Sequence, residues 1–139
     1  MITKTHHLYA QKKITIINDI NPGTWVNSDK HLLTIILRNL VMNAIKFSYE
    51  DSQIKVFAIQ NGGLVKLSVQ DHGVGMTSDH VKRLFSYDAM HAIGTKGETG
   101  TGLGLILCRD FVRKLGGNIW AKSELQKGST FTFSFASIA

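Results

Sequence analysis

Apolar and polar residues follow two periods along this chain, and each period predicts a different kind of element. Alternation predicts five strands, at residues 13–18, 53–60, 64–71, 118–123 and 129–136. Helical patterning predicts three helices, at residues 29–48, 78–84 and 102–115. Because strands come in pairs instead of alternating singly with helices, we expect an α+β fold with helices on one face of a mixed sheet.

Turn and cap signals set the boundaries of these elements. Asn27 or Ser28 is available to cap the helix over 29–48. The run Asn61-Gly62-Gly63 predicts a hairpin, and Gly116-Gly117 predicts the end of the last helix. Residues 86–101 carry three glycines and little periodicity, so we predict a mobile loop there. The apolar positions expected to share one face of the last helix are Leu103, Ile106, Leu107, Phe111 and Leu115.

Composition narrows the class of protein. A chain of 139 residues with 43% hydrophobic and 19% charged residues fits one globular domain. Nothing approaches the roughly 18 consecutive apolar residues of a membrane helix, and the N-terminus lacks a secretory signal. One cysteine suits a reducing cytosol. The net charge is +6, but the basic residues are scattered, so we expect a cytoplasmic domain that contacts neither nucleic acid nor membrane directly.

A polar stripe interrupts the predicted helix over 29–48. Asn39, Asn43 and Lys46 have i, i+4, i+7 spacing, which places them within about 60° of one another beside the apolar face. Two amides and an ammonium at the edge of the core are able to supply an Mg²⁺ ligand and phosphate donors. A solvated helix edge with no function has the same composition, so the spacing alone leaves both interpretations open.

A carboxylate ends the strand over 64–71. Alternation gives Asp71 the direction of the buried residues Val65 and Val69. A buried carboxylate needs a partner, and the exocyclic amine of adenine is one such donor. Gly73 and Gly75 then permit backbone close to a flat ring, or positive φ angles. An ordinary turn after a strand also uses Asp and Gly, and remains the alternative.

Two further segments carry candidate ligand-binding groups. Glycines at 100, 102 and 104 in GETGTGLGL lead into the last helix, where free backbone N–H groups favour an anion. The segment lacks the Gly-Lys-Ser/Thr of a P-loop and the βαβ context of a dinucleotide fingerprint, and a flexible loop is the alternative. Ser129 shares parity with the phenylalanines of the last strand, so its hydroxyl is expected to face inward, toward the pocket of Asp71.

Taken in order, these pieces resemble the ATPase superfamily shared by gyrase, Hsp90, MutL and histidine kinases. The matching boxes are NLVMNAIKFS, DHGVG, RLF at 83–85 and GTGLGL. The resemblance covers residues 12–136 and implies the Bergerat fold, a two-layer α/β sandwich in which about three helices cover one face of a mixed, mostly antiparallel sheet. It implies ATP and Mg²⁺ as cofactors, and a flexible lid at residues 86–99.

The resemblance also implies roles for individual residues. Asn43 is similar to the Mg²⁺ ligand, and Asn39 and Lys46 to its phosphate-side neighbours with catalytic roles. Asp71 is similar to the carboxylate that reads adenine, and Phe85 to the aromatic that anchors the lid. The remaining residues expected to line the nucleotide site are Phe47, Gly73, Gly75, Met76, Lys96, Gly100, Thr101, Gly102, Leu103, Gly104, Leu105 and Ser129.

Within this superfamily the sequence is most similar to the ATP-binding catalytic domain of two-component sensor histidine kinases. The hydrolases place a glutamate one turn before the metal-binding asparagine, where this chain has Asn39, which is no general base at neutral pH. None of the six histidines has the context of a phosphoacceptor. We therefore expect residues 1–11 to be the remnant of an upstream helical segment and residues 12–139 to be the catalytic domain.

The partners that the resemblance implies follow from this division. They are the helical dimerisation and phosphoacceptor domain of the parent protein, and then a response regulator. Two other interpretations remain open. One is an anti-sigma-factor type serine kinase, and the other is a nucleotide-binding module that regulates a partner without catalysis.

Overall fold

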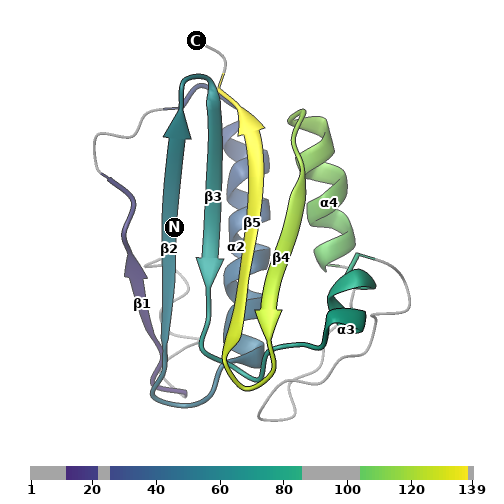
Figure 1. Cartoon of the computed structure of the whole chain (residues 1–139). Helices are drawn as coiled ribbons and strands as arrows, with labels where there is room; N and C mark the ends of the chain where they lie inside the picture. The colour runs from purple at the N-terminus through teal and green to yellow at the C-terminus, as the bar shows by residue number, and fades with distance from the viewer. Residues whose placement is uncertain (1–11, 22–25, 86–103, 138–139) are drawn as a thin grey trace.

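A computed structural model describes residues 12–21, 26–85 and 104–137, which form one five-stranded sheet and three helices (Figure 1). The strand order is β1-β2-β3-β5-β4. The bounds are β1 Thr15–Asn18, α2 Lys30–Phe47, β2 Gln53–Asn61, β3 Leu64–Gln70, α3 Ser78–Lys82, α4 Gly104–Lys114, β4 Ile119–Glu124 and β5 Gly128–Ala136. All five strands and three helices were predicted in this order.

The sheet is mixed and mostly antiparallel, as predicted. β1 runs parallel to β2, and the other three pairings are antiparallel. The β2–β3 hairpin is tighter than the sequence suggested, because Asn61 pairs with Leu64 within the ladder. The turn is therefore the two residues Gly62 and Gly63, and Gly62 has the positive φ of 60° that such a turn requires.

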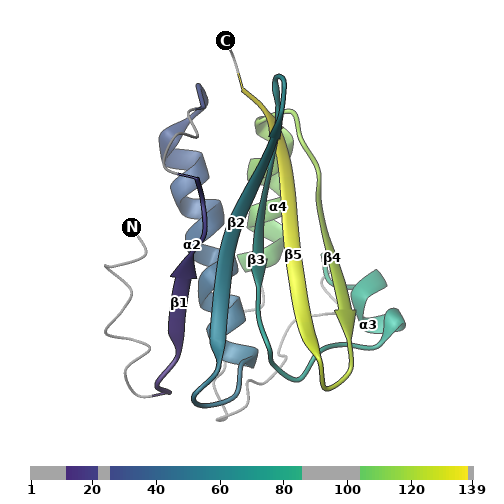
Figure 2. The same ribbon diagram turned by 60° about the vertical axis from the view of Figure 1, so that its left-hand side comes forward.

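Helices α2 and α4 pack on one face of the sheet, and the core lies between the two layers (Figure 2). The side chains that are fully buried there come from both layers. Leu40 of α2 and Val112 of α4 meet Val69 of β3 and Phe133 of β5 in one cluster. This is the predicted two-layer sandwich, and it fixes α2 firmly against the central strands.

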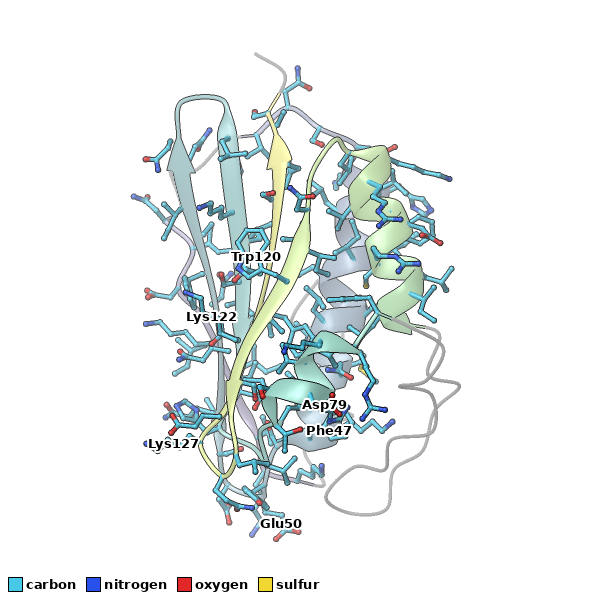
Figure 3. All side chains as sticks on the ribbon, turned by 45° about the vertical axis from the view of Figure 1, so that its right-hand side comes forward. Phe47, Glu50, Asp79, Trp120, Lys122 and Lys127 are labelled. Carbon is cyan, nitrogen blue, oxygen red and sulfur yellow. The ribbon has the colours of Figure 1, made fainter. Side chains whose placement is uncertain are left out.

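The opposite face of the sheet carries polar and aromatic side chains. Trp120 and Lys122 project from β4 on this face (Figure 3), and the Lys66 ammonium lies 5.8 Å from the centre of the Trp120 ring. Between the central strands, the hydroxyls of Ser68 and Thr132 are 2.8 Å apart and buried. The two faces thus differ as expected for a sheet packed on one side only.

The N-terminus of α2 is capped by Asp29, not by Asn27 or Ser28. The Asp29 side chain accepts a hydrogen bond of 3.0 Å from the Leu32 backbone N–H. This is the N–H three residues into the helix that a capping side chain normally reaches, so the capping residue must stand directly before Lys30. The prediction was therefore wrong by one residue.

The buried face of α4 differs from the predicted one. Leu107 is 46% exposed, whereas Cys108 and Val112 are fully buried. The face turns because Leu105 and Cys108 contact the core, which carries Leu107 to the outer side. Burial raises the pKa of the Cys108 thiol to about 12, so it stays protonated. Gly116, with a φ of 77°, ends the helix as predicted.

Candidate functional site

Asp71 lies directly after β3 and points inward, as predicted, with only 4% of its surface exposed. Its Oδ1 accepts hydrogen bonds from the backbone N–H groups of Gly73 (3.0 Å) and Ser129 (3.1 Å). Burial raises the pKa of the carboxyl above its ordinary value, although these two hydrogen bonds act in the opposite direction. Within the described part of the chain no group donates to Oδ2, so this oxygen remains available to a ligand donor.

Glycines allow backbone segments to meet closely around Asp71. A Cβ on Gly73 would overlap the carbonyl oxygen of Phe47, and a Cβ on Gly128 would overlap that of Asp71. Gly75 has a φ of 68°, and its Cβ would overlap the carbonyl oxygen of Glu124. The positive φ was one of the two reasons predicted for Gly75. At Gly73 and Gly75 the group in close approach is the backbone of another segment, Phe47 in the first case and Glu124 in the second.

Two backbone hydrogen bonds hold this loop from opposite sides. The Val74 N–H donates to the carbonyl of Phe47 at 3.1 Å, and the Val74 carbonyl accepts from the Gln126 N–H at 2.8 Å. Ser48 and Gly73 form an isolated bridge beside them. Residues 71–75 are therefore held between the C-terminus of α2, where Phe47 lies (Figure 3), and the β4–β5 turn.

Ser129 is buried beside Asp71, but its two polar groups have different partners. Its backbone N–H binds Asp71, whereas its hydroxyl lies 2.8 Å from the hydroxyl of Ser123 on β4. The expected inward direction is confirmed by the register, because Ser129 pairs with Ser123 two positions from the pair of Ala121 and Phe131, which contacts the core. Ser129 reaches the carboxylate through its backbone N–H. Gly128, directly before it, allows the chain to pass close to the backbone of Asp71.

The polar stripe of α2 lies at the edge of the core. Asn39, Asn43 and Lys46 are each partly buried, which is the position that their spacing predicted. The Asn39 amide donates to the Ile35 carbonyl at 2.9 Å, so its oxygen is free to face outward from the helix. Asn43 and Lys46 follow within two turns on the same side.

The first turn of α4 meets this stripe. A Cβ on Gly104 would lie 3.2 Å from Oδ1 of Asn39, so the N-terminus of α4 stands directly beside the asparagine. The N–H groups of a first helical turn have no partners within the helix and favour an anion. The Asn39 amide and the first described turn of α4 therefore share one location, which suits a phosphate group.

The two groups of residues are connected by α2. Asn39 and Phe47 are eight residues apart on one helix, which is about 12 Å along its axis. The C-terminus of α2 holds the loop of Asp71, and the stripe runs from Asn39 in the middle of α2 to Lys46 in its last turn. One rigid element thus fixes the separation between the buried carboxylate of Asp71 and the amide of Asn39.

The remaining predicted site residues divide into two sets. Met76, Phe85 and Leu105 are partly buried against the core near these groups. The carbonyl of Phe85 also accepts a hydrogen bond of 2.8 Å from Nη1 of Arg109, which joins the end of the α3 region to α4. The predictions that lie outside the described residues are the lid at 86–99 and Lys96, Gly100, Thr101, Gly102 and Leu103.

Sequence reasoning missed two buried polar residues next to the site. Lys12 had been counted among scattered surface charges, yet it is 4% exposed. Ser48 is fully buried, and its hydroxyl donates to the Ala44 carbonyl at 2.7 Å. Lys12 precedes the first predicted strand, and Ser48 ends the predicted helix over 29–48 as a polar residue whose periodicity gave no sign of burial, so neither was singled out. Both contact the C-terminus of α2.

In residues 12–21, 26–85 and 104–137, no group of three or more His, Cys, Asp or Glu side chains is arranged to hold a metal ion. A carboxylate and imidazole cluster is therefore not what this part of the chain offers. Over the same residues, no helix combines the length and the apolar character that crossing a membrane requires.

Comparisons with known proteins identify similar sequences. Residues 28–137 match the model of the histidine kinase-, DNA gyrase B- and HSP90-like ATPase family. The adaptive-response sensory kinase SasA of Prochlorococcus marinus is 36% identical over 110 residues, which are 78% of this chain and 30% of SasA. The aerobic respiration control sensor protein ArcB of Escherichia coli is 35% identical over 111 residues, 78% of this chain and 14% of ArcB. The chain thus spans less than a third of these relatives.

Solved structures give the same result for the fold. The catalytic domain of the histidine kinase ThkA superimposes with a TM-score of 0.81 at 26% identity, covering 97% of this chain and 86% of that one. Full-length ShkA in complex with AMPPNP superimposes with a TM-score of 0.79 at 29% identity, covering 99% of this chain and 30% of that one.

Proposed function

Because this chain belongs to the histidine kinase-, DNA gyrase B- and HSP90-like ATPase family, we propose that it binds Mg·ATP and transfers the γ-phosphoryl group to a histidine on a separate helical domain. Its fold is that of histidine kinase catalytic domains, and its relatives are sensor kinases. The observation that carries the proposal is the buried Asp71 carboxylate at the C-terminal end of α2 and the stripe that extends from Lys46 at this end to Asn39 in the middle of the same helix.

Asp71 is proposed to select adenine. Its Oδ1 is held by two backbone N–H groups, so the plane of the carboxylate is fixed before a ligand arrives. Oδ2 then accepts a hydrogen bond from the exocyclic amine of adenine. A base with a carbonyl oxygen at this position would bring two hydrogen-bond acceptors together. Oδ2 of the buried carboxylate would then receive no hydrogen bond from the ligand.

The stripe and the first turn of α4 are proposed to hold the triphosphate. Asn43 would ligate Mg²⁺ through its amide oxygen, which is the hard type of donor that this ion prefers. When bound, the ion neutralises charge that develops on the transferring phosphoryl group. Lys46 would donate to phosphate oxygens, and so would the amide N–H of Asn39 that the Ile35 carbonyl does not receive. The first described turn of α4 lies beside Asn39, and the N–H groups of a first helical turn would favour the same anion.

Transfer, not hydrolysis, is the proposed outcome. Asn39 stands where a water-activating carboxylate would be required, and an amide does not accept a proton at neutral pH. A neutral imidazole from another domain needs no such base, so positioning and charge neutralisation are sufficient. The relatives SasA and ArcB are named as sensory proteins, which favours a histidine acceptor over a serine acceptor.

The rest of the signalling pathway is part of the same proposal. Residues 1–11 would continue an upstream helical segment, and residues 12–139 would form the catalytic domain. The phosphoacceptor helices of the parent, and then a response regulator, would be its partners. The histidine kinase ThkA has been crystallised in complex with a response regulator, which supports the choice of that partner. The cytoplasm, where ATP is supplied, is the proposed location.

A mixing experiment tests this function. The chain is incubated with γ-labelled ATP, Mg²⁺ and the separately produced phosphoacceptor domain of its parent. We expect label on that domain that is labile in acid and stable in base, which identifies phosphohistidine. Acid-stable label would indicate a serine kinase. Tight ATP binding without transfer would indicate a regulatory module.

A further inference from the structure

Lys12 places a charged group in a buried cage of carbonyl oxygens. The residue is 4% exposed, and its Nζ donates to the carbonyls of Ile45 (2.8 Å), Lys46 (3.1 Å) and Ser48 (3.1 Å). An ammonium has three N–H donors, and three carbonyls receive them. These partners stabilise the buried ammonium, because a buried charge without hydrogen-bond partners would carry a large desolvation cost.

The cage is the C-terminus of α2. The last four carbonyls of a helix have no partners within it. Here Ser48 Oγ donates to the carbonyl of Ala44, Lys12 to those of Ile45 and Lys46, and the Val74 N–H to that of Phe47. A positive charge at this end also opposes the helix dipole. Lys12 therefore fixes the position of residues 45–48.

Residues 45–48 in turn fix the loop of Asp71. In the sequence, Phe47 lies between Lys46 and Ser48, whose carbonyls Lys12 binds. The carbonyl of Phe47 accepts the Val74 N–H at 3.1 Å. Gly73 packs against the same carbonyl, and its own N–H donates to Oδ1 of Asp71. The contacts thus run without a gap from the ammonium of Lys12 to the carboxylate of Asp71.

We propose that Lys12 is a positioning residue for adenine recognition, acting through the C-terminus of α2 on the loop that holds Asp71. The proposal rests on the proposed nucleotide site. Lys12 also joins this site to the start of the domain. Its backbone carbonyl accepts the Asp51 N–H at 3.0 Å before β2, and β1 follows three residues later. A change at this point of the chain therefore acts on the adenine end of the site.

Four variants of the whole chain separate positioning from general stability. Lys12→Met keeps the length of the side chain and removes the charge. Lys12→Arg keeps the charge, but a planar guanidinium does not place three donors as an ammonium does. Lys13→Met removes the neighbouring exposed charge. Val112→Ala weakens the core at a fully buried position in α4, away from the α2 C-terminus.

The readouts are the dissociation constants for adenosine and Mg·ATP, the melting temperature and the KM and kcat of transfer. For Lys12→Met we expect the adenosine constant to rise about tenfold and the Mg·ATP constant to rise at least as much, because the displaced residues 45–48 hold the Asp71 loop and also include Lys46. KM for ATP should rise similarly with kcat within about twofold. Lys12→Arg should fall between this variant and the wild type. Lys13→Met and Val112→Ala should keep both constants, although Val112→Ala melts earlier.

Several results would overturn the proposal. Wild-type affinity for adenosine in Lys12→Met is one, and weakened Mg·ATP binding with unchanged adenosine binding is another. Equal weakening in Val112→Ala at a matched loss of melting temperature would leave Lys12 a purely structural role. If Lys12→Met does not fold, unchanged adenosine affinity in Lys12→Arg overturns the proposal equally. A wild-type chain that binds neither ligand would instead refute the proposed function, and this inference with it.

Discussion

The two ends of the candidate site are formed by different kinds of groups, backbone groups at one end and mainly side chains at the other. Around Asp71, backbone groups make the contacts: two N–H groups bind its Oδ1, and glycines bring three segments into close approach. Around Asn39, side chains on one helix edge and the first turn of α4 make them. The first end is therefore part of how the chain folds, whereas the second is added to a helix that would fold without it.

This difference predicts how each end responds to substitution. A change in the Asp71 loop should alter stability and ligand binding together, because the same hydrogen bonds serve both. A change in the stripe should alter the chemistry and leave the fold intact, since Asn39, Asn43 and Lys46 are only partly buried. Four substitutions test this contrast, and their expected free-energy effects decrease from Asn43→Ala to Asn39→Ala.

Asn43→Ala should have the largest effect, and only on activity. Loss of the proposed Mg²⁺ ligand removes a preorganised electrostatic contact, which corresponds to a decrease of about a thousandfold in the rate of transfer. The initial rate with the phosphoacceptor domain measures this. The melting temperature should stay within a few degrees of the wild type, because the side chain lies outside the buried core. A variant that unfolds, or that transfers at the wild-type rate, contradicts the assignment.

Gly73→Ala should mainly reduce stability. Its new Cβ overlaps the Phe47 carbonyl oxygen, so the loop or the α2 terminus must shift, at a cost of about 3 kcal/mol in the free energy of unfolding. Gly63→Ala is the matched control, because its Cβ would meet only Ser137 O at 3.7 Å. That variant should stay within about 0.5 kcal/mol of the wild type in urea denaturation. Equal losses in the two variants would show that crowding at Gly73 is unimportant.

Asp71→Asn should weaken nucleotide binding and stabilise the empty domain. Loss of a charged hydrogen bond to adenine corresponds to about a thirtyfold rise in the dissociation constant, near 2 kcal/mol. The Asn oxygen still accepts from Gly73 and Ser129, so the loop keeps its bonds. Calorimetric titration with ATP measures the first effect. Asp19→Asn, at an exposed carboxylate paired with Lys55, is the control.

The stabilisation depends on pH in a defined direction. Burial raises the pKa of Asp71 above its ordinary value of 3.8, so the folded chain binds the proton more tightly than the unfolded chain. The contribution of Asp71 to stability is therefore fully present below pH 3.8 and is lost as the pH rises through the folded pKa. Asp71→Asn should exceed the wild type in unfolding free energy at pH 7, and this gap should close on acidification. A gap that widens in acid would refute the argument.

Asn39→Ala should have the smallest effect. The Asn39 amide has a partner within its own helix, the Ile35 carbonyl, and only its oxygen side faces Gly104. We expect a loss of about fivefold in transfer, near 1 kcal/mol, with unchanged stability. Initial rates at saturating ATP provide the test. A loss as large as that of Asn43→Ala would mean that Asn39 ligates the metal as well.

The sequence predicts those site residues whose directions follow from the periodicity of a strand or a helix. Asp71 keeps the parity of β3, and Asn39, Asn43 and Lys46 keep the turn of α2, so their directions were predicted and are confirmed by their burial. The order of strands and helices was predicted for the same reason. Alternation and helical periodicity report which side of an element meets the core, and they do so over many residues.

The features that the sequence did not predict depend on contacts between distant segments. Lys12 lies outside any periodic element, and only the fold brings it to the end of α2, more than thirty positions later. Ser129 was expected to use its hydroxyl, but the tight glycine before it presents its N–H to Asp71. Leu107 fits a helical face drawn from apolar residues alone, whereas the buried Cys108 sets the actual one.

The central claim is that Asp71 and Asn43 hold opposite ends of one nucleotide, and adenosine tests it most directly because it lacks the phosphates. Its dissociation constant is measured by NMR titration in the wild type, Asp71→Asn and Asn43→Ala, beside that of Mg·ATP. Asp71→Asn should weaken both ligands by about thirtyfold, and Asn43→Ala should weaken Mg·ATP while adenosine stays within about twofold. Unchanged adenosine binding in Asp71→Asn, or equal weakening of both ligands in Asn43→Ala, would contradict the account.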